Sequence, residues 1–141
     1  MRPILLVEDN PMDIDLTRRA FARRHLANPI DVARDGEEAL ARLAEWTAGK
    51  AQPVVILLDL NLPKVSGLEV LQALKSHDAY KRIPVVVLTT SREDADVNRA
   101  YTLGANSYIV KPVDFARFTE VAEQVQLYWS DLNTPCSRQH A

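Results

Sequence analysis

Acidic, hydroxyl and amino side chains stand directly after four short apolar segments of the sequence. Glu8 and Asp9 follow PILLV, Asp59 follows VVILL, Thr89 follows PVVVL, and Lys111 follows SYIV. If each segment is a strand of one parallel sheet, these side chains lie along the same edge of it. Crowded carboxylates repel one another unless a cation compensates their charge. Because the side chains offer oxygen ligands without histidine or cysteine, we expect a hard cation, Mg²⁺.

This set of groups is suited to accepting a phosphoryl group. A carboxylate can act as the nucleophile, while a metal ion and a lysine ammonium compensate the charge of the phosphoryl oxygens. Each residue alone also has an ordinary structural explanation, because an acid after a strand commonly caps a turn or a helix. The prediction depends on finding chemically matched groups at four strand ends together.

Three of the apolar segments have the composition of buried strands. PILLV at 3–7, VVILL at 54–58 and PVVVL at 84–88 are continuous, as expected for strands covered on both faces of a parallel sheet. IDVAR at 30–34 and SYIV at 107–110 mix polar and apolar residues, which favours positions nearer the sheet edges.

Segments of helical length separate these strands. The first begins at Asn10-Pro11, and the second begins near Asp35-Gly36. The third carries leucines at 68, 71 and 74, the fourth spans 92–103 before Gly104, and the last runs from about 114 to 132. Strand and helix alternate five times, which predicts an α/β fold with a doubly wound, parallel five-stranded sheet and helices on both faces.

The composition limits the function classes. The 141 residues, 47% of them apolar, suffice for one domain, expected over 1–132, with a flexible tail at 133–141. A net charge of -2 without a basic stripe argues against nucleic-acid binding, and the single cysteine, Cys136, excludes a disulfide framework. Neither a signal peptide nor an apolar run of about 20 residues is found, so we expect a cytoplasmic protein without membrane contact.

Four motifs resemble those of one known family. VEDN at 7–10, LLDLNLP at 57–63, VVLTTS at 86–91 and YIVKP at 108–112 are similar to the motifs of the receiver domain of two-component response regulators. The resemblance covers residues 3 to about 127. It implies a flavodoxin-like (βα)5 fold with the strand order 2-1-3-4-5.

The resemblance implies a role for each acidic residue. Asp59 is expected to be the phosphoacceptor, which receives its phosphoryl group from a histidine kinase. Asp9, Asp59 and the backbone carbonyl of Asn61 are expected to bind Mg²⁺ directly. Glu8 stands where many members have aspartate, so we expect it to act through a metal-bound water molecule.

The remaining motif residues acquire roles in the same way. Thr89 is expected to hydrogen-bond one phosphoryl oxygen, and Lys111 to pair with another. The Lys111–Pro112 peptide bond is expected to be cis, which would hold the lysine loop in place. Tyr108 is the expected aromatic switch, turning inward when Thr89 moves toward the phosphoryl group. The alternative for Tyr108 is a partly exposed strand aromatic without such a role.

Within the family, EDNPMDIDL near the start and YWSDLN near the end resemble single-domain regulators paired with phytochrome-type histidine kinases. Only nine residues follow position 132, which is too few for a DNA-binding domain. The expected output is therefore contact with an unidentified downstream protein or feedback on the kinase. Such a domain is a signalling module rather than an enzyme that turns over a substrate.

The last helix carries an apolar arc that is longer than the sheet. From Phe115 to Leu132 it would extend about 26 Å, whereas a strand of five or six residues covers about 17–20 Å. We expect Tyr128, Trp129 and Leu132 to reach beyond the sheet. These residues are the expected interface of a symmetric homodimer formed through the last helix and the adjoining strand.

Two other functions fit the fold less well. A magnesium-dependent phosphohydrolase with an aspartyl-phosphate intermediate would usually carry a second aspartate two residues after the nucleophile, and Asn61 stands there instead. A flavin-binding module would need a phosphate-binding loop after the first strand, where Glu8 and Asp9 place two negative charges.

Overall fold

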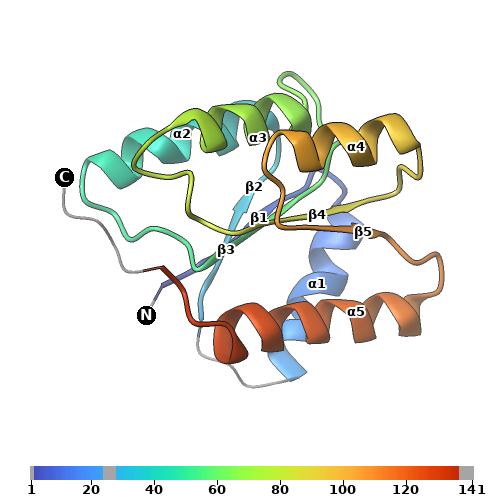
Figure 1. Cartoon of the computed structure of the whole chain (residues 1–141). Coiled ribbons are helices and arrows are strands. Elements are labelled where there is room, and N and C mark those ends of the chain that lie inside the picture. Colours follow the sequence, from blue (N-terminus) through green and yellow to red (C-terminus); the bar gives the residue numbers. More distant parts are fainter. Residues whose placement is uncertain (1, 24–27, 137–141) are drawn as a thin grey trace.

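The computed structural model describes residues 2–23 and 28–136, in which strands and helices alternate along the chain (Figure 1). The strands are β1 (Ile4–Val7), β2 (Ile30–Ala33), β3 (Val55–Leu58), β4 (Val85–Thr89) and β5 (Ser107–Val110). They form one sheet in the order β2-β1-β3-β4-β5, and each neighbouring pair is parallel. The predicted fold class and strand order are confirmed.

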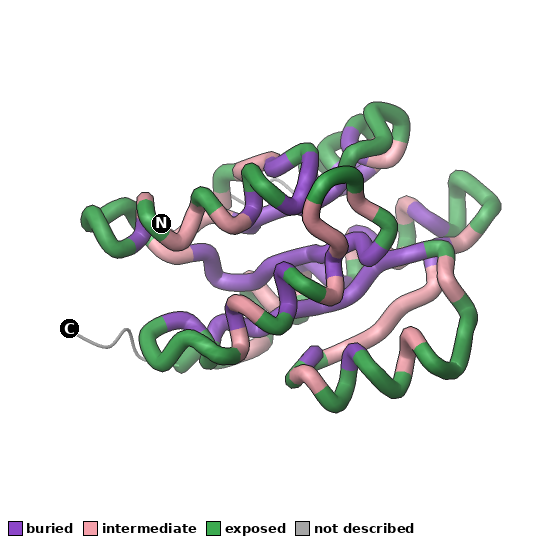
Figure 2. Tube along the Cα trace, turned by 90° about the horizontal axis from the view of Figure 1, so that it is seen from above, coloured by how far each residue is buried: buried purple, intermediate pink, exposed green. Residues whose placement is uncertain are grey.

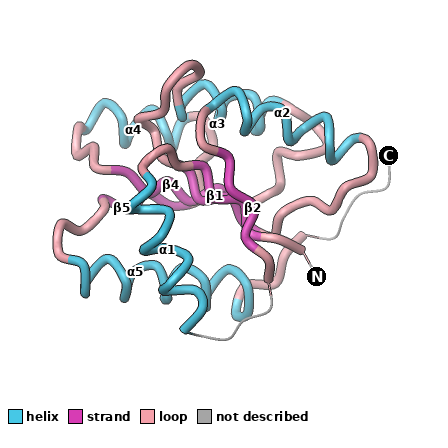
Figure 3. Tube along the Cα trace, turned by 180° about the vertical axis from the view of Figure 1, so that it is seen from behind, coloured by secondary structure: helices cyan, strands magenta, loops and turns pink. Residues whose placement is uncertain are grey.

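Helices cover both faces of this sheet. They are α1 (Pro11–Arg23), α2 (Gly36–Thr47), α3 (Gly67–Ser76), α4 (Asp94–Thr102) and α5 (Phe115–Leu127). In Figure 1, α1 and α5 lie below the sheet, whereas α2, α3 and α4 lie above it; Figure 3 shows the same two layers from behind. The chain therefore has three layers, as expected when parallel strands are joined by helical crossovers.

The central strands β1 and β3 are apolar along their whole length because both of their faces are covered. In β1, Leu5 and Val7 contact the core below α2, α3 and α4, while Ile4 and Leu6 contact the core next to α1 and α5. Figure 2 shows buried residues along the middle of the sheet and exposed residues on the outer sides of the helices. The two strands with mixed composition, β2 and β5, occupy the sheet edges, as predicted.

Local hydrogen bonds determine where several helices begin. Asp35 accepts a hydrogen bond from the backbone N–H of Glu38 at the start of α2, and Asn10 does the same for Met12 in α1. Ser66 and Glu69 form a reciprocal capping box at the start of α3. Such caps fix where each strand-to-helix loop ends, and those loops lie at the sheet edge where the acidic residues were expected.

The end of the last helix differs from the prediction. Instead of one α-helix to position 132, α5 ends at Leu127 and a π-helical turn, η1, covers Tyr128–Leu132. Phe115, at the start of the apolar arc, is 61% exposed, whereas Phe118 and Val125 further along the helix are buried. A helical wheel at about 100° per residue assumes α-helical geometry up to Leu132, and the wider π-turn changes the directions of the side chains at 128–132. Phe115, the first residue of α5, lies outside that turn.

The structure bears on two further expectations, the flexible tail at 133–141 and the lack of membrane contact, only within the residues that it describes. Asn133–Cys136 lack regular secondary structure apart from a bend, while the rest of the predicted tail lies outside the described residues. No helix in the described ranges is both long and apolar enough to cross a bilayer.

Gly67 brings the start of α3 into direct contact with the end of β3. A Cβ atom at this position would overlap the carbonyl oxygen of Asp59 and the Cα atom of Leu60. The N–H of Gly67 also donates to the carbonyl of Leu60 at 3.0 Å. The missing side chain therefore allows the helix to pack against backbone at the strand end.

We expect Gly67→Ala to lower the free energy of unfolding by about 1–3 kcal/mol, because the added methyl group must displace backbone. Gly49→Ala is the comparison: Gly49 has a φ of 107°, but a Cβ atom added there would meet no described atom within 4 Å, so only backbone strain applies. Urea unfolding of both variants measures the difference. A smaller loss for Gly67→Ala than for Gly49→Ala would contradict the packing argument.

Candidate active site

The predicted acidic residues converge at one edge of the sheet. Glu8 and Asp9 follow β1, and Asp59 follows β3, the strand beside it. One carboxylate oxygen from each residue lies within 4.8 Å of the other two. Glu8 and Asp59 are buried, whereas Asp9 is exposed and gives the cluster access to solvent.

The sheet hydrogen bonds continue past the strand ends and fix this backbone. The N–H of Asp59 donates to the carbonyl of Val7 at 3.0 Å, and that of Lys111 to the carbonyl of Thr89 at 2.7 Å. The N–H of Glu8 donates to the carbonyl of Ala33 at 3.0 Å. The side chains are thus positioned by rigid strands rather than by mobile loops.

The Asp59 carboxylate accepts hydrogen bonds on both oxygens. Its Oδ1 accepts from Thr89 Oγ1 at 2.9 Å and from the N–H of Asn61 at 3.0 Å. Its Oδ2 accepts from Lys111 Nζ at 2.9 Å. The predicted phosphoacceptor, hydroxyl and ammonium therefore form one contiguous group, with the donors already arranged around the carboxylate.

The Lys111 ammonium lies among three carboxylates. Besides Asp59, its Nζ contacts Glu8 Oε1 and lies 2.8 Å from Asp13 Oδ2. Burial alone would lower the pKa of Lys111, but the hydrogen bonds that it donates to Asp13 and Glu8 outweigh this effect and raise its pKa above the usual lysine value. The lysine is therefore held positively charged within the site.

Burial and the contact with Lys111 have opposing effects on the pKa of Glu8. Burial raises the pKa of its carboxyl to about 7, although the hydrogen bond and charge of Lys111 partly counteract this. The nearby charge of Asp59 adds to the increase, and the backbone N–H of Asn10 donates to Glu8 Oε2 at 3.2 Å. A cation that compensates these crowded acids would favour the ionised form of Glu8.

The expected cis bond before Pro112 is wrong. The structure contains no cis peptide bond in residues 2–23 and 28–136, so Lys111 and Pro112 are joined in trans. The ordinary trans form is preferred even before proline, by about 0.5–1 kcal/mol. Here Lys111 Nζ contacts the carboxylates with the trans bond in place, so the cis form is not needed to bring the ammonium to Asp59.

Two other predicted residues lie around this centre. The side-chain amide of Asn61 is 3.5 Å from Thr90 Oγ1, and its backbone carbonyl belongs to the loop directly after Asp59. Tyr108, on β5, is partly buried, and its hydroxyl donates to the carbonyl of Ser91 at 3.0 Å. The tyrosine therefore contacts the same strand-end segment that carries Thr89.

Asp13 is a site residue that the sequence reasoning missed. Its position in the first turn of α1 suggested only a favourable charge at a helix start. In the structure its carboxylate reaches Lys111. The available signal was positional, because a helix that follows β1 after a short loop must begin at the edge where the strands end.

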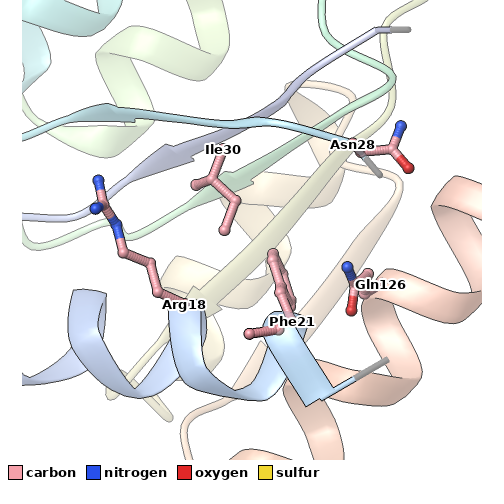
Figure 4. A pocket seen from close by; sticks show the side chains of 6 residues that line it. Arg18, Phe21, Asn28, Ile30 and Gln126 are labelled. Carbon is pink, nitrogen blue, oxygen red and sulfur yellow. The ribbon is translucent and has the colours of Figure 1, made fainter. Parts of the chain in front are cut away.

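A separate hollow lies at the opposite edge of the sheet, near the start of β2. Figure 4 shows its lining between α1, β2 and α5, where Arg18, Phe21, Asn28, Ile30 and Gln126 surround the space. None of its lining residues is acidic. It therefore has no part in the arrangement around Asp59.

The donor set at Asp59 fits a hard divalent cation. It consists of carboxylate oxygens, and the cluster includes neither histidine nor cysteine. Such ligands suit Mg²⁺ or Mn²⁺, which accept a few carboxylates and retain several water molecules.

The family model of the response regulator receiver domain matches residues 4–123 of the chain. The chain belongs to this family. A receiver domain is in general a signalling module of two-component systems, and its phosphoryl group is accepted on an aspartate at an acidic, divalent-cation site. The geometry around Asp59 agrees with this chemistry.

Comparisons of sequence and structure find response regulators and other regulatory proteins that are similar to this chain over most of its length. The "Probable methanogenesis regulatory protein FilR2" of Methanothrix harundinacea (strain 6Ac) is 46% identical over 132 residues, covering 92% of this chain and 84% of that protein. The phosphorylated cyanobacterial phytochrome response regulator RcpA is 40% identical with a TM-score of 0.91, covering 96% of this chain and 99% of that one. The Mn²⁺-bound form of response regulator Rcp1 is 35% identical with a TM-score of 0.91, covering 97% and 100%.

We expect Asp9→Asn to weaken Mn²⁺ binding roughly tenfold or more, because it removes one carboxylate from a site that depends on charge compensation. Isothermal titration calorimetry with MnCl₂ and with MgCl₂ measures the change. Asp78→Asn is the control, since Asp78 is exposed and pairs with Lys81. Equal affinities of Asp9→Asn and wild type would exclude Asp9 as a ligand.

Proposed function

We propose that this receiver domain accepts a phosphoryl group on Asp59 from a histidine kinase, with Mg²⁺ held by Asp9, Asp59 and the backbone carbonyl of Asn61. The observation that carries the proposal is the Asp59 carboxylate, which lies between Thr89 and Lys111 and beside two further acids. Glu8 would act on the metal through a bound water molecule. The cation supplies positive charge that offsets the phosphoryl oxygens when it is bound.

The transfer step follows from this arrangement. An Asp59 oxygen forms the new bond to phosphorus while the bond from phosphorus to the donor breaks, and the leaving group keeps that electron pair. Thr89 and Lys111 already donate to the Asp59 carboxylate. They can donate instead to oxygens of the incoming phosphoryl group, so the site contributes positioning and charge rather than acid-base chemistry.

The phosphoryl group is proposed to act as a signal. In this proposal, Thr89 moves toward a phosphoryl oxygen. Tyr108 changes position with it, because the tyrosine hydroxyl donates to the carbonyl of Ser91, two residues after Thr89. Asn61 stands where an aspartyl-phosphate phosphohydrolase would need an acid, so turnover of a small substrate is not favoured. The phosphorylated domain contacts an unidentified downstream protein.

A phytochrome-type kinase is the proposed phosphoryl donor. RcpA, with 40% identity, is a cyanobacterial phytochrome response regulator, and its likeness extends over 96% of this chain. The motifs at both ends of the sequence point to the same group. A phosphotransfer profile against histidine kinases, beginning with phytochrome-like ones, tests the pairing; preferential transfer from an unrelated kinase would overturn it.

We expect acetyl phosphate and Mg²⁺ to add one acid-stable, base-labile phosphoryl group to the wild-type protein and none to Asp59→Asn. The substitution removes the nucleophilic carboxylate but retains the size of the side chain. Intact-mass spectrometry at low pH detects the modification. Asp78→Asn, an exposed acid outside the site, should be modified as fast as the wild type; modification of Asp59→Asn to the wild-type extent would contradict the assignment.

We further propose that two copies associate through α5, η1 and β5. Tyr128 and Leu132 are 49% and 64% exposed in η1, and Tyr128 lines a groove between β5 and α5. Trp129 also lines this groove, but it packs partly against the core and contributes less free surface than expected. Burying exposed apolar side chains at a two-fold axis would stabilise such a dimer.

Replacing Tyr128 and Leu132 by serine together should reduce the dimer fraction in sedimentation velocity at tens of micromolar protein. Tyr101→Ser is a matched control, because Tyr101 is also 49% exposed but lies on α4. Measurements with and without acetyl phosphate show whether association needs phosphorylation. A monomeric wild type under both conditions would exclude the dimer, as would a double variant that dimerises like the wild type.

A further inference from the structure

Asp13 differs from the other acids around Lys111 in the element that carries it. Its backbone belongs to α1, where Asn10 Oδ1 accepts hydrogen bonds from the N–H groups of Met12 and Asp13. The carbonyl of Asp13 accepts from the buried hydroxyl of Thr17 at 2.8 Å. The position of the Asp13 carboxylate is therefore set by a capped helix, independently of the strand ends that carry the metal cluster.

The ammonium group of Lys111 has three N–H bonds, and three carboxylates accept them. Two of these acceptors, Glu8 and Asp59, also belong to the three-acid cluster that suits a divalent cation. Asp13 contacts Lys111 at 2.8 Å but is not a member of that cluster. The lysine thus shares two of its partners with the metal site and has a third partner outside it.

A divalent cation and an ammonium group compete for the same carboxylates. When the cation binds, it withdraws negative charge from Glu8 and Asp59, and its own charge repels the lysine. The hydrogen bond from Lys111 to Asp13 would remain, because Asp13 is not a member of the metal cluster. This bond is partly buried and joins two charged groups, and such bonds are stronger than those between neutral groups.

From this division of partners we infer that Asp13 is a positioning residue, which keeps the Lys111 ammonium beside Asp59 while the metal site is loaded. The lysine is then in place to pair with an incoming phosphoryl oxygen. The pairing of Lys111 with a phosphoryl oxygen rests on the proposed function. The hydrogen bond from Lys111 to Asp13, in contrast, is a property of the unphosphorylated protein. A purely structural Asp13 would contribute only a favourable charge at the start of α1.

The side-chain ammonium signal of Lys111 in ¹⁵N NMR reports the anchoring directly, and Lys111→Met assigns it. In the wild type, we expect a signal protected from solvent exchange both without metal and with saturating MgCl₂. In Asp13→Asn, the signal should persist without metal, because Glu8 and Asp59 remain, and disappear when MgCl₂ is added. Asp13→Glu, which restores a carboxylate, should regain the signal.

Asp15→Asn is the matched control, since Asp15 lies on the same helix but is exposed and pairs with Arg19. It should behave like the wild type in every measurement. Modification by acetyl phosphate at saturating Mg²⁺ should be slowed about tenfold in Asp13→Asn, the scale expected for losing one charge-assisted hydrogen bond. Thermal unfolding of each variant shows that the fold is retained.

Two results would overturn the inference: a Lys111 signal that Asp13→Asn keeps in the presence of MgCl₂, or one that it loses already without metal. The first result would mean that Asp13 is not needed to hold Lys111 when the metal site is occupied. The second would mean that Glu8 and Asp59 do not hold the lysine in the absence of metal. Because the NMR measurement needs no phosphoryl transfer, its outcome is separate from the test of Asp59. A wild type that accepts no phosphoryl group but shows the expected signals would refute only the proposed function.

Discussion

The arrangement depends on the contact between one buried ammonium and several crowded carboxylates. Without Lys111, the acids at the ends of β1 and β3 would face one another in a partly desolvated space, where like charges repel strongly. The single ammonium faces three carboxylates, those of Glu8, Asp13 and Asp59. Together with Asp9, Glu8 and Asp59 leave an oxygen-rich site that suits a divalent cation.

This contact is possible only because parallel strands end at a common edge. β1, β3 and β5 are not consecutive in the sequence, yet the order β2-β1-β3-β4-β5 brings their carboxyl ends to one side of the molecule. The apolar strand segments fill the two cores, and the polar residues that follow them lie at that edge, where Glu8 and Asp59 are buried and Asp9 is exposed. The same burial that stabilises the sheet therefore determines where the chemistry is located.

Most of the fold and the centre of the site could be predicted from sequence because they follow from strong, local patterns. Buried strands have few alternatives to continuous apolar segments, and Glu8 and Asp59 each follow such a segment directly. Asp13 escaped prediction because its role requires knowing how α1 is oriented over the strand ends. That orientation comes from tertiary packing, which helical periodicity alone does not contain.

The remaining differences also have physical causes. The peptide bond before Pro112 depends on a small energy difference that a motif cannot determine for a particular chain. The last helix ends in a π-turn that contains Trp129, which packs partly against the core, and such a turn moves each following side chain away from its place on an ideal helical wheel. Both features depend on details of packing to which the hydrophobic pattern is insensitive.

The direct contact of α3 with the Asp59 carbonyl has a consequence for how this region can change over evolution. At most core positions, neighbouring side chains can adopt new rotamers to accommodate a larger residue. At Gly67 the obstacle is main chain, and it is the main chain of the proposed nucleophile itself. A residue larger than glycine there must displace either the start of α3 or the backbone that carries Asp59, so helix packing and the position of the proposed nucleophile are linked at this residue.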